Sequence, residues 1–423
     1  MVGCRKCTPD KPLLRAVAAA GAGCEAPTVR VLYSFPDGIG RPGIGTTAYN
    51  QVRELAGHGA DVTLYCTSQH RELPGNVRVV RTLTVGGRRI PHRALGIDRA
   101  YRYHDARVAV ALRRGGEFDA VHCWPRATIR TAEAARKRGI ASFREVPNTH
   151  TAHAFDEVAR ELATLGLSPE RGHSHTFDRD ALRREEREYE VAEFLLVPSE
   201  HSLRTFVERH VPGEKLVLHR YGYDPRRFSP GAERDSDQQF TAIFVGRCEP
   251  RKGLHYALRA WLDSGAAATG RFVVCGAFEP AYRETVASLL GHPSIEVRGF
   301  VDDPAALMRE SDVLLFPSVE EGSALVAYEA QACGCVPVVS EATGARVRDG
   351  VDGLVHAPRD AATLTEQLRR VHENRELLVA LRAATLESSR NLTWSAAGAE
   401  LLRLYADAPA AGRTAVAAAT TGR

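Results

Sequence analysis

The stretch from Val313 to Ser340, VLLFPSVEEGSALVAYEAQACGCVPVVS, constrains the fold more than any other part of the chain. It starts with a short apolar run, which a Pro-Ser step interrupts, and it ends in a second apolar run. Such runs are typical of buried parallel strands. We expect a helix between them that Gly322 opens and Gly334 closes. The stretch therefore predicts strand, loop, helix and strand in an α/β domain.

Two glutamates in this stretch are candidate ligand-binding residues. Glu321 lies in the loop before the expected helix, and Glu329 lies about two turns inside it, so both carboxylates can face one small ligand. The first N–H groups of a helix have no intrahelical partners and attract anions. These groups belong to Gly322, Ser323, Ala324 and Leu325. The pattern predicts a site for a phosphate that is flanked by hydroxyl groups.

The paired glutamates, the Glu-Gly step and the EAQACGCVPVVS continuation resemble the signature of the GT4-type family of retaining, nucleotide-sugar-dependent glycosyltransferases. The resemblance covers roughly Thr28 to Ala406 and is stronger in the second half. It implies an α/β, GT-B fold, in which two Rossmann-like, doubly wound domains face each other across a cleft. It also implies that Glu329 binds the donor ribose, and that Glu321 binds sugar hydroxyls and orients the donor without acting as a nucleophile.

A second motif of the donor side is the loop RCEPRKG after the strand FTAIFVG. Arg247 and Lys252 lie on this loop, where two cations suit a diphosphate leaving group. In the family that the chain resembles, these two positions bind the donor pyrophosphate. The loop that starts at Phe300 corresponds to the place where relatives read the nucleotide base.

A glycine-rich turn follows the first strand, TVRVLYSF. Gly38, Gly40 and Gly43 spell G-x-G-x-x-G, which suggests a dinucleotide-binding turn. The second strand, DVTLYCTS, lacks the acidic residue that such a site needs at its end, and no GK[ST] follows. The resemblance implies instead that Gly43 and Gly45 approach the donor closely. A plain turn that joins strand to helix remains the alternative.

Three histidines follow strands of the first half, where ligands of doubly wound sheets bind. By resemblance to the family, His150 is the first choice for a catalytic contact with the donor sugar, although REVPNTH departs from the usual family motif. His122 and His153 are acceptor-side candidates. Each of the three is alternatively a local hydrogen-bonding residue.

The segment from Gly86 to Arg114 is basic, with eight arginines against two aspartates and with Tyr101 and Tyr103 between them. It suits an anionic membrane surface, an anionic acceptor or a solvated helix face, and the sequence leaves these open. The net charge of +4 is too small to indicate nucleic acid. Nine cysteines are scattered along the chain, which is typical of reduced thiols. The apolar stretch near the N-terminus is too weak for a signal peptide, and no apolar run is long enough to span a membrane. We therefore expect a cytoplasmic protein, which works at the cytoplasmic face of a membrane if its acceptor is lipid-linked.

The predicted organisation has two domains between two disordered ends. The boundaries are a leader at 1–27, an acceptor domain at 28–230, a donor domain at 240–390, a helix at 391–408 that crosses back to the first domain, and a tail at 409–423.

The predicted reaction transfers a glycosyl unit from a nucleoside diphosphate sugar to an acceptor hydroxyl with retention of configuration. No Asp-x-Asp motif follows a strand in a ligand-binding position, so we expect no obligatory metal or other cofactor. The motifs do not distinguish among UDP, GDP and ADP as the nucleotide of the donor. They also leave the acceptor open, which is a lipid-linked glycan, a polysaccharide or a small metabolite. The alternatives are a sugar-nucleotide epimerase of the same fold and a non-catalytic subunit that binds nucleotide sugar.

Overall fold

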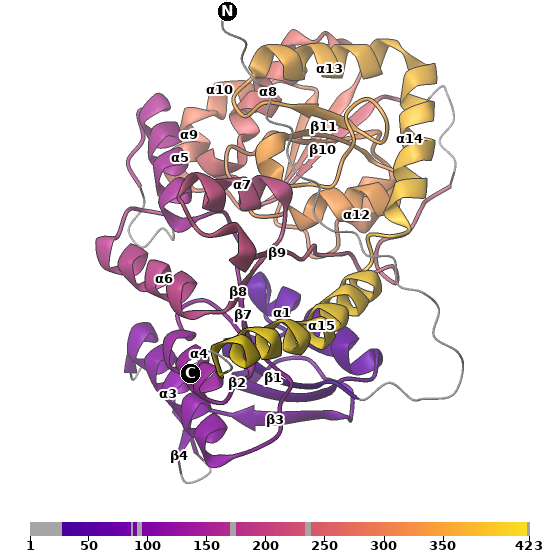
Figure 1. The fold of residues 1–423 in the computed structure, drawn as a ribbon. Helices are drawn as coiled ribbons and strands as arrows, with labels where there is room; N and C mark the ends of the chain where they lie inside the picture. The colour runs from indigo at the N-terminus through magenta and orange to yellow at the C-terminus, as the bar shows by residue number, and fades with distance from the viewer. Residues whose placement is uncertain (1–27, 86–87, 91–94, 170–174, 233–237, 421–423) are drawn as a thin grey trace, which may run out of the picture.

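The computed structural model describes residues 28–420, apart from 86–87, 91–94, 170–174 and 233–237. The leader predicted at 1–27 lies outside the described residues. The described part forms two α/β domains joined near the middle of the molecule (Figure 1).

The first domain is built on a parallel sheet with the strand order β3-β2-β1-β6-β7-β8-β9. Its strands are β1 (Arg30–Ile39), β2 (Asp61–Gln69), β3 (Val77–Arg81), β6 (Ala120–Cys123), β7 (Ala141–Glu145), β8 (Phe194–Val197) and β9 (Leu216–Leu218). Its helices are α1 (Ile44–Gly57), α3 (Ile97–Arg114), α4 (Ile129–Lys137), α5 (Thr151–Thr164), α6 (Arg179–Val191) and α7 (Glu200–Glu208), and β4 (Thr84–Val85) pairs with β5 (Arg88–Arg89). The order reverses at β1, which places the carboxyl ends of β1 and β6 side by side.

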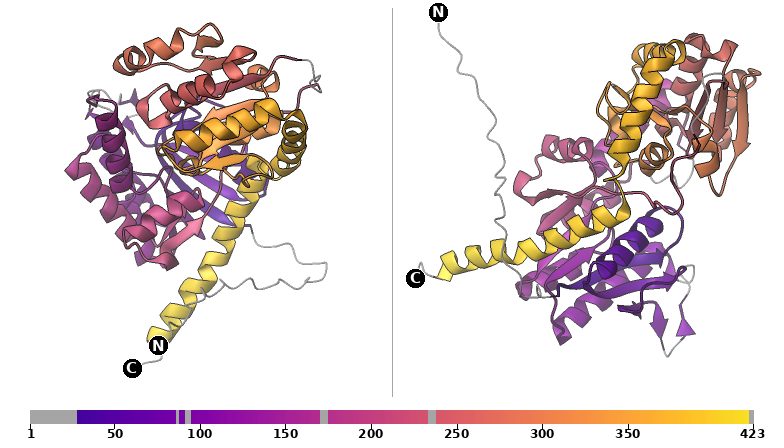
Figure 2. Two further views of the ribbon diagram at one scale, coloured as in Figure 1. Left: turned by 90° about the horizontal axis from the view of Figure 1, so that it is seen from above. Right: turned by 90° about the vertical axis from the view of Figure 1, so that its right-hand side faces the viewer.

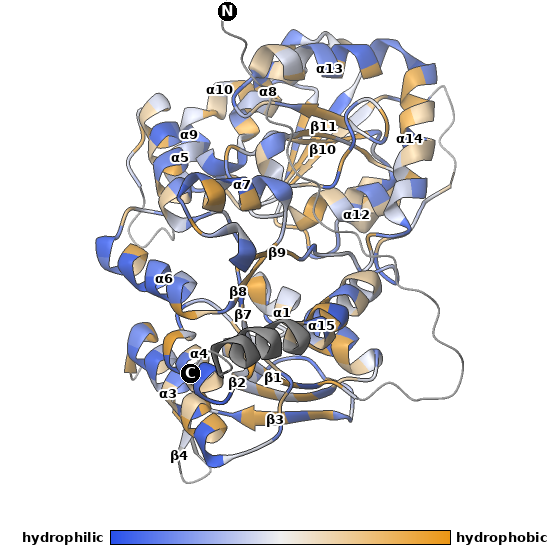
Figure 3. Cartoon of the chain, viewed as in Figure 1, coloured by the Kyte–Doolittle hydropathy of each residue, from blue (hydrophilic) through white to orange (hydrophobic). Residues whose placement is uncertain are grey.

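The second domain has a parallel sheet with the order β12-β11-β10-β13-β14-β15. Its strands are β10 (Thr241–Val245), β11 (Arg271–Cys275), β12 (Ile295–Gly299), β13 (Val313–Phe316), β14 (Val336–Ser340) and β15 (Leu354–His356). Its helical segments are η2 (Pro250–Lys252), α8 (Leu254–Asp263), α9 (Pro280–Thr285), α10 (Ala287–Leu290), α11 (Ala305–Arg309), α12 (Leu325–Cys333), α13 (Ala361–Glu373) and α14 (Arg375–Ser389). Central strands such as β10 and β11 are hydrophobic along their length, whereas α6 is mainly hydrophilic (Figure 3). Fully buried strands need this composition because helices cover both faces of the sheet.

One element of the first half of the sequence packs on the second domain. Leu165 and Leu167, just after α5, lie against the core of the second domain. Near the end of α5, buried Glu161 contacts His255 Nε2 at 2.9 Å and Arg359 Nε at 2.7 Å, both from the second domain. The end of α5 therefore forms part of the interface between the two domains.

The last helix, α15 (Trp394–Thr420), leads from the second domain back along the first (Figure 2). Leu401 and Tyr405 are fully buried in the core of the first domain, and the Tyr405 hydroxyl lies 2.6 Å from His122 Nδ1. The helix extends through residues 409–420, where the sequence predicted a disordered tail; residues 421–423 lie outside the described part.

We expect Tyr405→Ala to lower the free energy of unfolding by about 3–5 kcal/mol, as truncation of a large buried side chain leaves a cavity. Tyr405→Phe keeps the ring and removes only the partner of His122, so its cost should be about 1–3 kcal/mol. Urea unfolding of both variants measures whether Tyr405→Ala loses more free energy of unfolding than Tyr405→Phe. Equal, small effects would show that α15 does not stabilise the first domain.

None of the helices in the described ranges combines the length and the apolar character that crossing a bilayer requires. Six cysteines in those ranges are buried free thiols: Cys66, Cys123, Cys248, Cys275, Cys333 and Cys335.

Candidate active site

The loop between β13 and α12 carries Glu321 and differs in one respect from the prediction. The helix begins at Leu325, three residues after Gly322, since the backbone of Ala324 is still extended, with φ -73° and ψ 103°. The Ala324 N–H donates to the Thr343 carbonyl at 2.9 Å. The N–H of Ala324 is therefore not available to a phosphate, and the first helical N–H groups are those of Leu325 and Val326. The Ser323 hydroxyl lies 2.9 Å from the Tyr328 hydroxyl and is buried.

Glu321 is held by two cations from the loop after β10. Its carboxylate accepts from Arg251 at 2.6 Å and from Lys252. Burial raises the pKa of Glu321, but Lys252 and Arg251 outweigh it, so the pKa lies below its ordinary value. Glu321 is therefore an ionised carboxylate in a largely buried position, next to the cation that the sequence assigned to the diphosphate.

Glu320 is a second carboxylate of the same loop, which the sequence reasoning missed. It is fully buried and accepts from Arg251 at 3.0 Å and from Thr149 of the first domain at 2.5 Å, and His175 Nε2 lies 3.8 Å away. Burial would raise its pKa, but Arg251 and His175 lower the pKa to about 2. In the sequence, Glu320 and Arg251 are marked only by lying next to the candidate residues Glu321 and Lys252.

The same loop packs tightly against the first domain. The Ser199 hydroxyl donates to the Gly322 carbonyl at 2.6 Å. A Cβ on Gly322 would collide with the backbone of Pro147 and Asn148, so only glycine fits at this contact. The orientation of the loop therefore depends on both domains.

We expect Thr149→Val to lower kcat about tenfold, since a hydrogen bond to a charged group contributes about 1.5–3 kcal/mol and this one orients the loop that carries Glu321. Thr149→Ser keeps the hydroxyl and should retain activity. Steady-state kinetics of the two variants measure the change in kcat, and nucleotide affinity is measured alongside for comparison. Equal loss in both variants would exclude the hydrogen bond as the cause.

Arg247 belongs to the same network of charges as Lys252. Its side chain is 58% exposed and pairs with Glu249 at 3.3 Å and with Glu279 at 3.0 Å. Glu249 also contacts Arg251 Nε at 3.0 Å, which links Arg247 to the Glu321 cluster. Lys252 is largely buried, and burial together with Arg251 lowers its pKa. Lys252 is thus fixed at the site, whereas Arg247 lies at its exposed edge.

Glu329 and the loop that starts at Phe300 have charged neighbours of their own, Arg227 and Asp303. Burial raises the pKa of Glu329 to about 7, with Arg227 opposing the shift and Asp303 adding to it. Arg227 lies 3.6 Å from Asp303, three residues after Phe300, so Glu329 and the loop after β12 share one neighbourhood. Phe300 is 75% exposed, which leaves its ring open to a ligand.

The two candidate glycines have different surroundings. Gly43 has a φ of 81°, is exposed, and has no atom within 4 Å of the place of a Cβ. Its backbone is therefore open to a ligand. Gly45 is buried, and a Cβ there would meet the Gly38 carbonyl at 2.8 Å, so Gly45 is required for packing of the turn.

The structure corrects the interpretation of His122. Its ring is fully buried, stacks on Tyr33 with centroids 4.3 Å apart, and shares a hydrogen bond with Tyr405 of α15. His122 therefore stabilises the core instead of meeting an acceptor.

His150 and His153 both lie at the start of α5. His150 is buried and caps α5, as its Nδ1 accepts from the Ala152 N–H at 3.2 Å. Burial, with Arg209, lowers its pKa to about 4, so the ring is neutral. His153 lies 5.9 Å from the ring of His201. Thr149, one position before His150, donates a side-chain hydrogen bond to the Glu321 loop, and the catalytic role of His150 stays a prediction.

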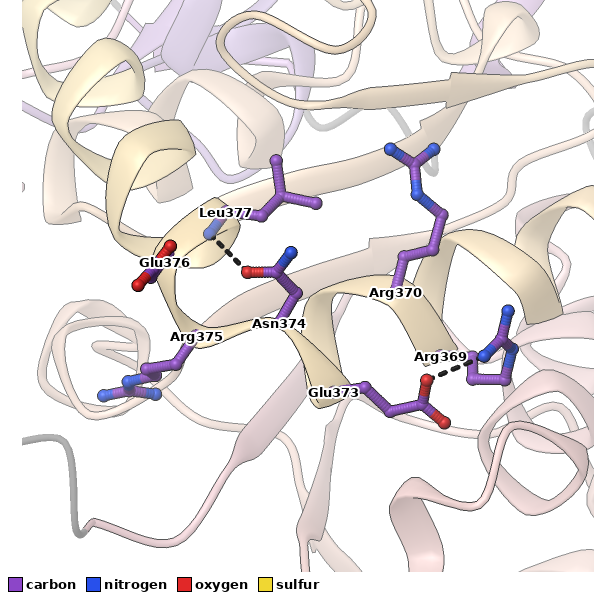
Figure 4. Close-up of a pocket in the computed structure, with 7 residues that line it drawn as sticks. All are labelled: Arg369, Arg370, Glu373, Asn374, Arg375, Glu376 and Leu377. Carbon is purple, nitrogen blue, oxygen red and sulfur yellow. Dashed lines mark hydrogen bonds and ion pairs between the residues drawn. The ribbon is translucent and has the colours of Figure 1, made fainter.

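A separate cavity of about 550 Å³ lies where α13 meets α14 (Figure 4). Its lining consists of residues 369–370 and 373–377, and none of the candidate site residues is among them. In the ranges that the structure describes, no three or more His, Cys, Asp or Glu side chains form a group suited to a metal ion.

Sequence comparisons match both halves of the chain to family models. Residues 42–227 match "Glycosyltransferase Family 4", and residues 239–374 match "Glycosyl transferases group 1". The D-inositol 3-phosphate glycosyltransferase of Geodermatophilus obscurus is 30% identical over 368 residues, which covers 78% of this chain and 77% of the relative. The chain belongs to glycosyltransferase family 4. The corresponding enzyme of Acidothermus cellulolyticus is 26% identical over 448 residues, with 96% of both chains covered.

Solved structures confirm the GT-B fold of this family 4 glycosyltransferase. Sucrose-phosphate synthase from Thermosynechococcus elongatus is 18% identical, has a TM-score of 0.67, and aligns over 91% of this chain and 100% of its own. Anabaena HepE in complex with UDP and glucose is 15% identical, has a TM-score of 0.62, and aligns over 90% and 100%. The predicted family, the two-domain architecture and the general function as a glycosyltransferase are therefore confirmed.

Proposed function

We propose that this glycosyltransferase transfers a glycosyl unit from a nucleoside diphosphate sugar to an acceptor hydroxyl with retention of anomeric configuration. The observation that carries the proposal is the ionised Glu321 between Lys252 and Arg251, beside the start of α12. A fixed anion and fixed cations within one buried cluster suit a reaction that separates a positive sugar centre from a negative diphosphate. The solved relative HepE binds UDP and UDP-glucose, which supports a nucleotide-sugar donor.

In this proposal each charged group has one role. Lys252, with Arg247 at the edge, binds the diphosphate and neutralises the charge that develops on it as the glycosidic bond breaks. Glu321 binds sugar hydroxyls and stabilises the positive charge at the reacting carbon. Arg251 holds Glu321 and Glu320 in position. Glu329 accepts from the ribose diol, Phe300 offers its exposed ring to the base, and the open backbone at Gly43 approaches the donor from the first domain.

The experiment that tests this function is incubation with UDP-, GDP- and ADP-sugars, with nucleoside diphosphate release measured with and without acceptor. The anomeric configuration of the product tests retention. The names of the curated relatives specify D-inositol 3-phosphate, which makes a polyol phosphate the first acceptor to try. Conversion of one sugar nucleotide into another without transfer would indicate an epimerase, and binding without turnover would indicate a non-catalytic subunit.

We expect full activity in EDTA. Arg247, Arg251 and Lys252 supply positive charge at the place where some glycosyltransferases use a divalent cation, so no metal is needed to stabilise the diphosphate. Rates measured with EDTA, Mg²⁺ and Mn²⁺ check this. Loss of activity in EDTA that only a divalent cation restores would contradict the proposed mechanism.

For location, we propose the cytoplasm, with contact to an anionic membrane surface through the basic face of α3 if the acceptor is lipid-linked. Arg99, Arg102, Arg107, Arg113 and Arg114 of this helix are exposed, and Val110 beside them is exposed too. Exposed cations with apolar neighbours are the composition that binds anionic headgroups. Sedimentation with anionic and neutral vesicles tests the contact.

A further inference from the structure

One arginine of the second domain holds the end of α5, a helix that follows a strand of the first domain. Glu157 and Glu161 lie four residues apart on α5, so their side chains share one face of the helix. Arg359 lies in the turn between β15 and α13. Its guanidinium donates to the Glu161 carboxylate at 2.7 Å, to the Glu157 carboxylate at 2.6 Å and to the Glu157 carbonyl at 3.1 Å. Three hydrogen bonds from one side chain of the second domain therefore end on α5.

The charges at this contact are largely enclosed. The Glu161 side chain is fully buried, and its second partner is His255 Nε2 of α8, at 2.9 Å. Burial alone would raise the pKa of Glu161, but His255 and Arg359 outweigh it, so the pKa lies below its ordinary value and the carboxylate is ionised. A buried charge depends strongly on its partners, so separation of α5 from the second domain is costly.

The backbone at Arg359 supports a functional reason for this contact. Arg359 has a φ of 68°, a conformation that costs a non-glycine residue free energy. Glycine would adopt this conformation with less strain. The fold keeps an arginine at the position, and the hydrogen bonds described above connect its side chain to α5.

The opposite end of α5 lies beside the candidate active site. Thr149, two residues before the helix, donates to Glu320 at 2.5 Å, and Glu320 is the direct neighbour of Glu321. At the same end, the His150 N–H donates to Thr205 of α7 at 3.0 Å, which anchors the helix in the first domain. About 18 Å of helix separates this end from the carboxylates that the arginine holds. Because a helix is stiff, a tilt at one end moves the other.

We propose that Arg359 is a positioning residue for the transfer reaction. It clamps the end of α5 to the second domain and thereby sets the orientation in which Thr149 holds the loop of Glu320 and Glu321. The proposal rests on the function proposed above and adds a residue outside the candidate site that controls its geometry. Misplacement of a reacting group by about 1 Å can cost 10²-fold in rate, so control at this distance has a measurable effect.

The first test is the kinetics of Arg359→Gln. Its kcat should fall about tenfold, as for Thr149→Val, while the Kd of a nucleoside diphosphate changes less than about twofold, because Lys252 is held by a separate ion pair. Arg160→Gln is the matched control. Arg160 also pairs with Glu157, at 3.1 Å, but it lies on α5 itself and is 63% exposed. Equal kcat in Arg359→Gln and Arg160→Gln would overturn the proposal.

A double-mutant cycle tests whether Arg359 acts through Thr149. Variants separated by about 18 Å of helix ordinarily have independent effects. If the clamp acts through Thr149, the double variant Thr149→Val, Arg359→Gln should have about the same kcat as Thr149→Val alone. A merely structural arginine would give two losses that multiply, and that result would overturn the proposal.

Arg359→Gly separates positioning from folding. Glycine removes the same side chain and relieves the strained φ, so this variant should be at least as stable to urea as Arg359→Gln, with kcat lowered to the same extent. Recovery of kcat in Arg359→Gly, in step with a recovery of stability, would mean that the arginine acts only through folding. The proposal would then be wrong.

Hydrogen exchange without substrates distinguishes a failure of this proposal from a failure of the proposed function. In Arg359→Gln, amides at the end of α5 should exchange about tenfold faster, the effect of losing a charge-assisted contact. Amides of Val319 and Ala324 on the Glu321 loop, which donate to backbone carbonyls, should also exchange faster, and Arg160→Gln should change neither region. These changes in a protein that releases no nucleoside diphosphate from any donor would retain the clamp and remove the enzyme function. Unchanged exchange on the Glu321 loop would overturn the proposal whatever the activity.

Discussion

Lys252→Ala is expected to weaken the binding of a nucleoside diphosphate by about 10- to 100-fold, since a charge-assisted contact is lost from a largely buried position. Arg247→Ala should cost less. Arg247 is 58% exposed and already pairs with Glu249 and Glu279, so phosphate must compete with these carboxylates and with water. The double variant should lose several kcal/mol, on the order of two such contacts.

Calorimetry with UDP, GDP and ADP measures these losses. Arg369→Ala is a matched control, because Arg369 pairs with Glu366 and Glu373 on α13 and belongs to the separate cavity in Figure 4. Unchanged diphosphate affinity in the double variant would mean that the loop after β10 does not bind the donor.

The local parts of the site were predictable from the sequence. Each of the two short motifs lies within one strand-loop-helix unit, so the positions of its residues follow from the local pattern. One motif places Glu321 on the loop and Glu329 on the helix after a buried strand. The other places Arg247 and Lys252 on the loop after a second strand. Both strands are central in one parallel sheet, so their carboxyl ends meet. This is why Lys252 and Glu321, 69 residues apart, contact each other.

Contacts between the domains were not predictable from local patterns. Thr149 and Glu320 are 171 residues apart, and neither stands out in its own segment. The contacts of the loop before α12 are distant in sequence as well, since Ser199 donates to the Gly322 carbonyl and the Ala324 N–H donates to the Thr343 carbonyl. The position of His122 near the end of a strand predicts that it lies at the edge of the sheet where ligands bind. The local sequence does not predict that Tyr405, 283 residues later, covers the His122 ring.

We expect Glu321→Gln to lower kcat about 10²- to 10³-fold, the cost of removing one preorganised group that stabilises transition-state charge. The positive charge on the sugar grows as the bond breaks, so the ionised carboxylate is worth more in the transition state than in the complex with donor. Free diphosphate lacks the sugar. Its affinity should therefore hardly change, since Lys252 remains and loses only its competing carboxylate.

Glu329→Gln is the variant that should show the opposite pattern. The ribose does not react, so loss of this contact is expected to raise the KM of the donor and the Kd of the diphosphate with little change in kcat. Because burial holds the pKa of Glu329 at about 7, donor affinity should rise as pH increases through 7, where the carboxylate forms, and this step should vanish in Glu329→Gln. A sugar nucleotide suits this titration, since it has no terminal phosphate that titrates near pH 6. If Glu321→Gln weakens diphosphate binding as much as Glu329→Gln does, or if the pH step persists in Glu329→Gln, the two carboxylates do not have the roles assigned to them.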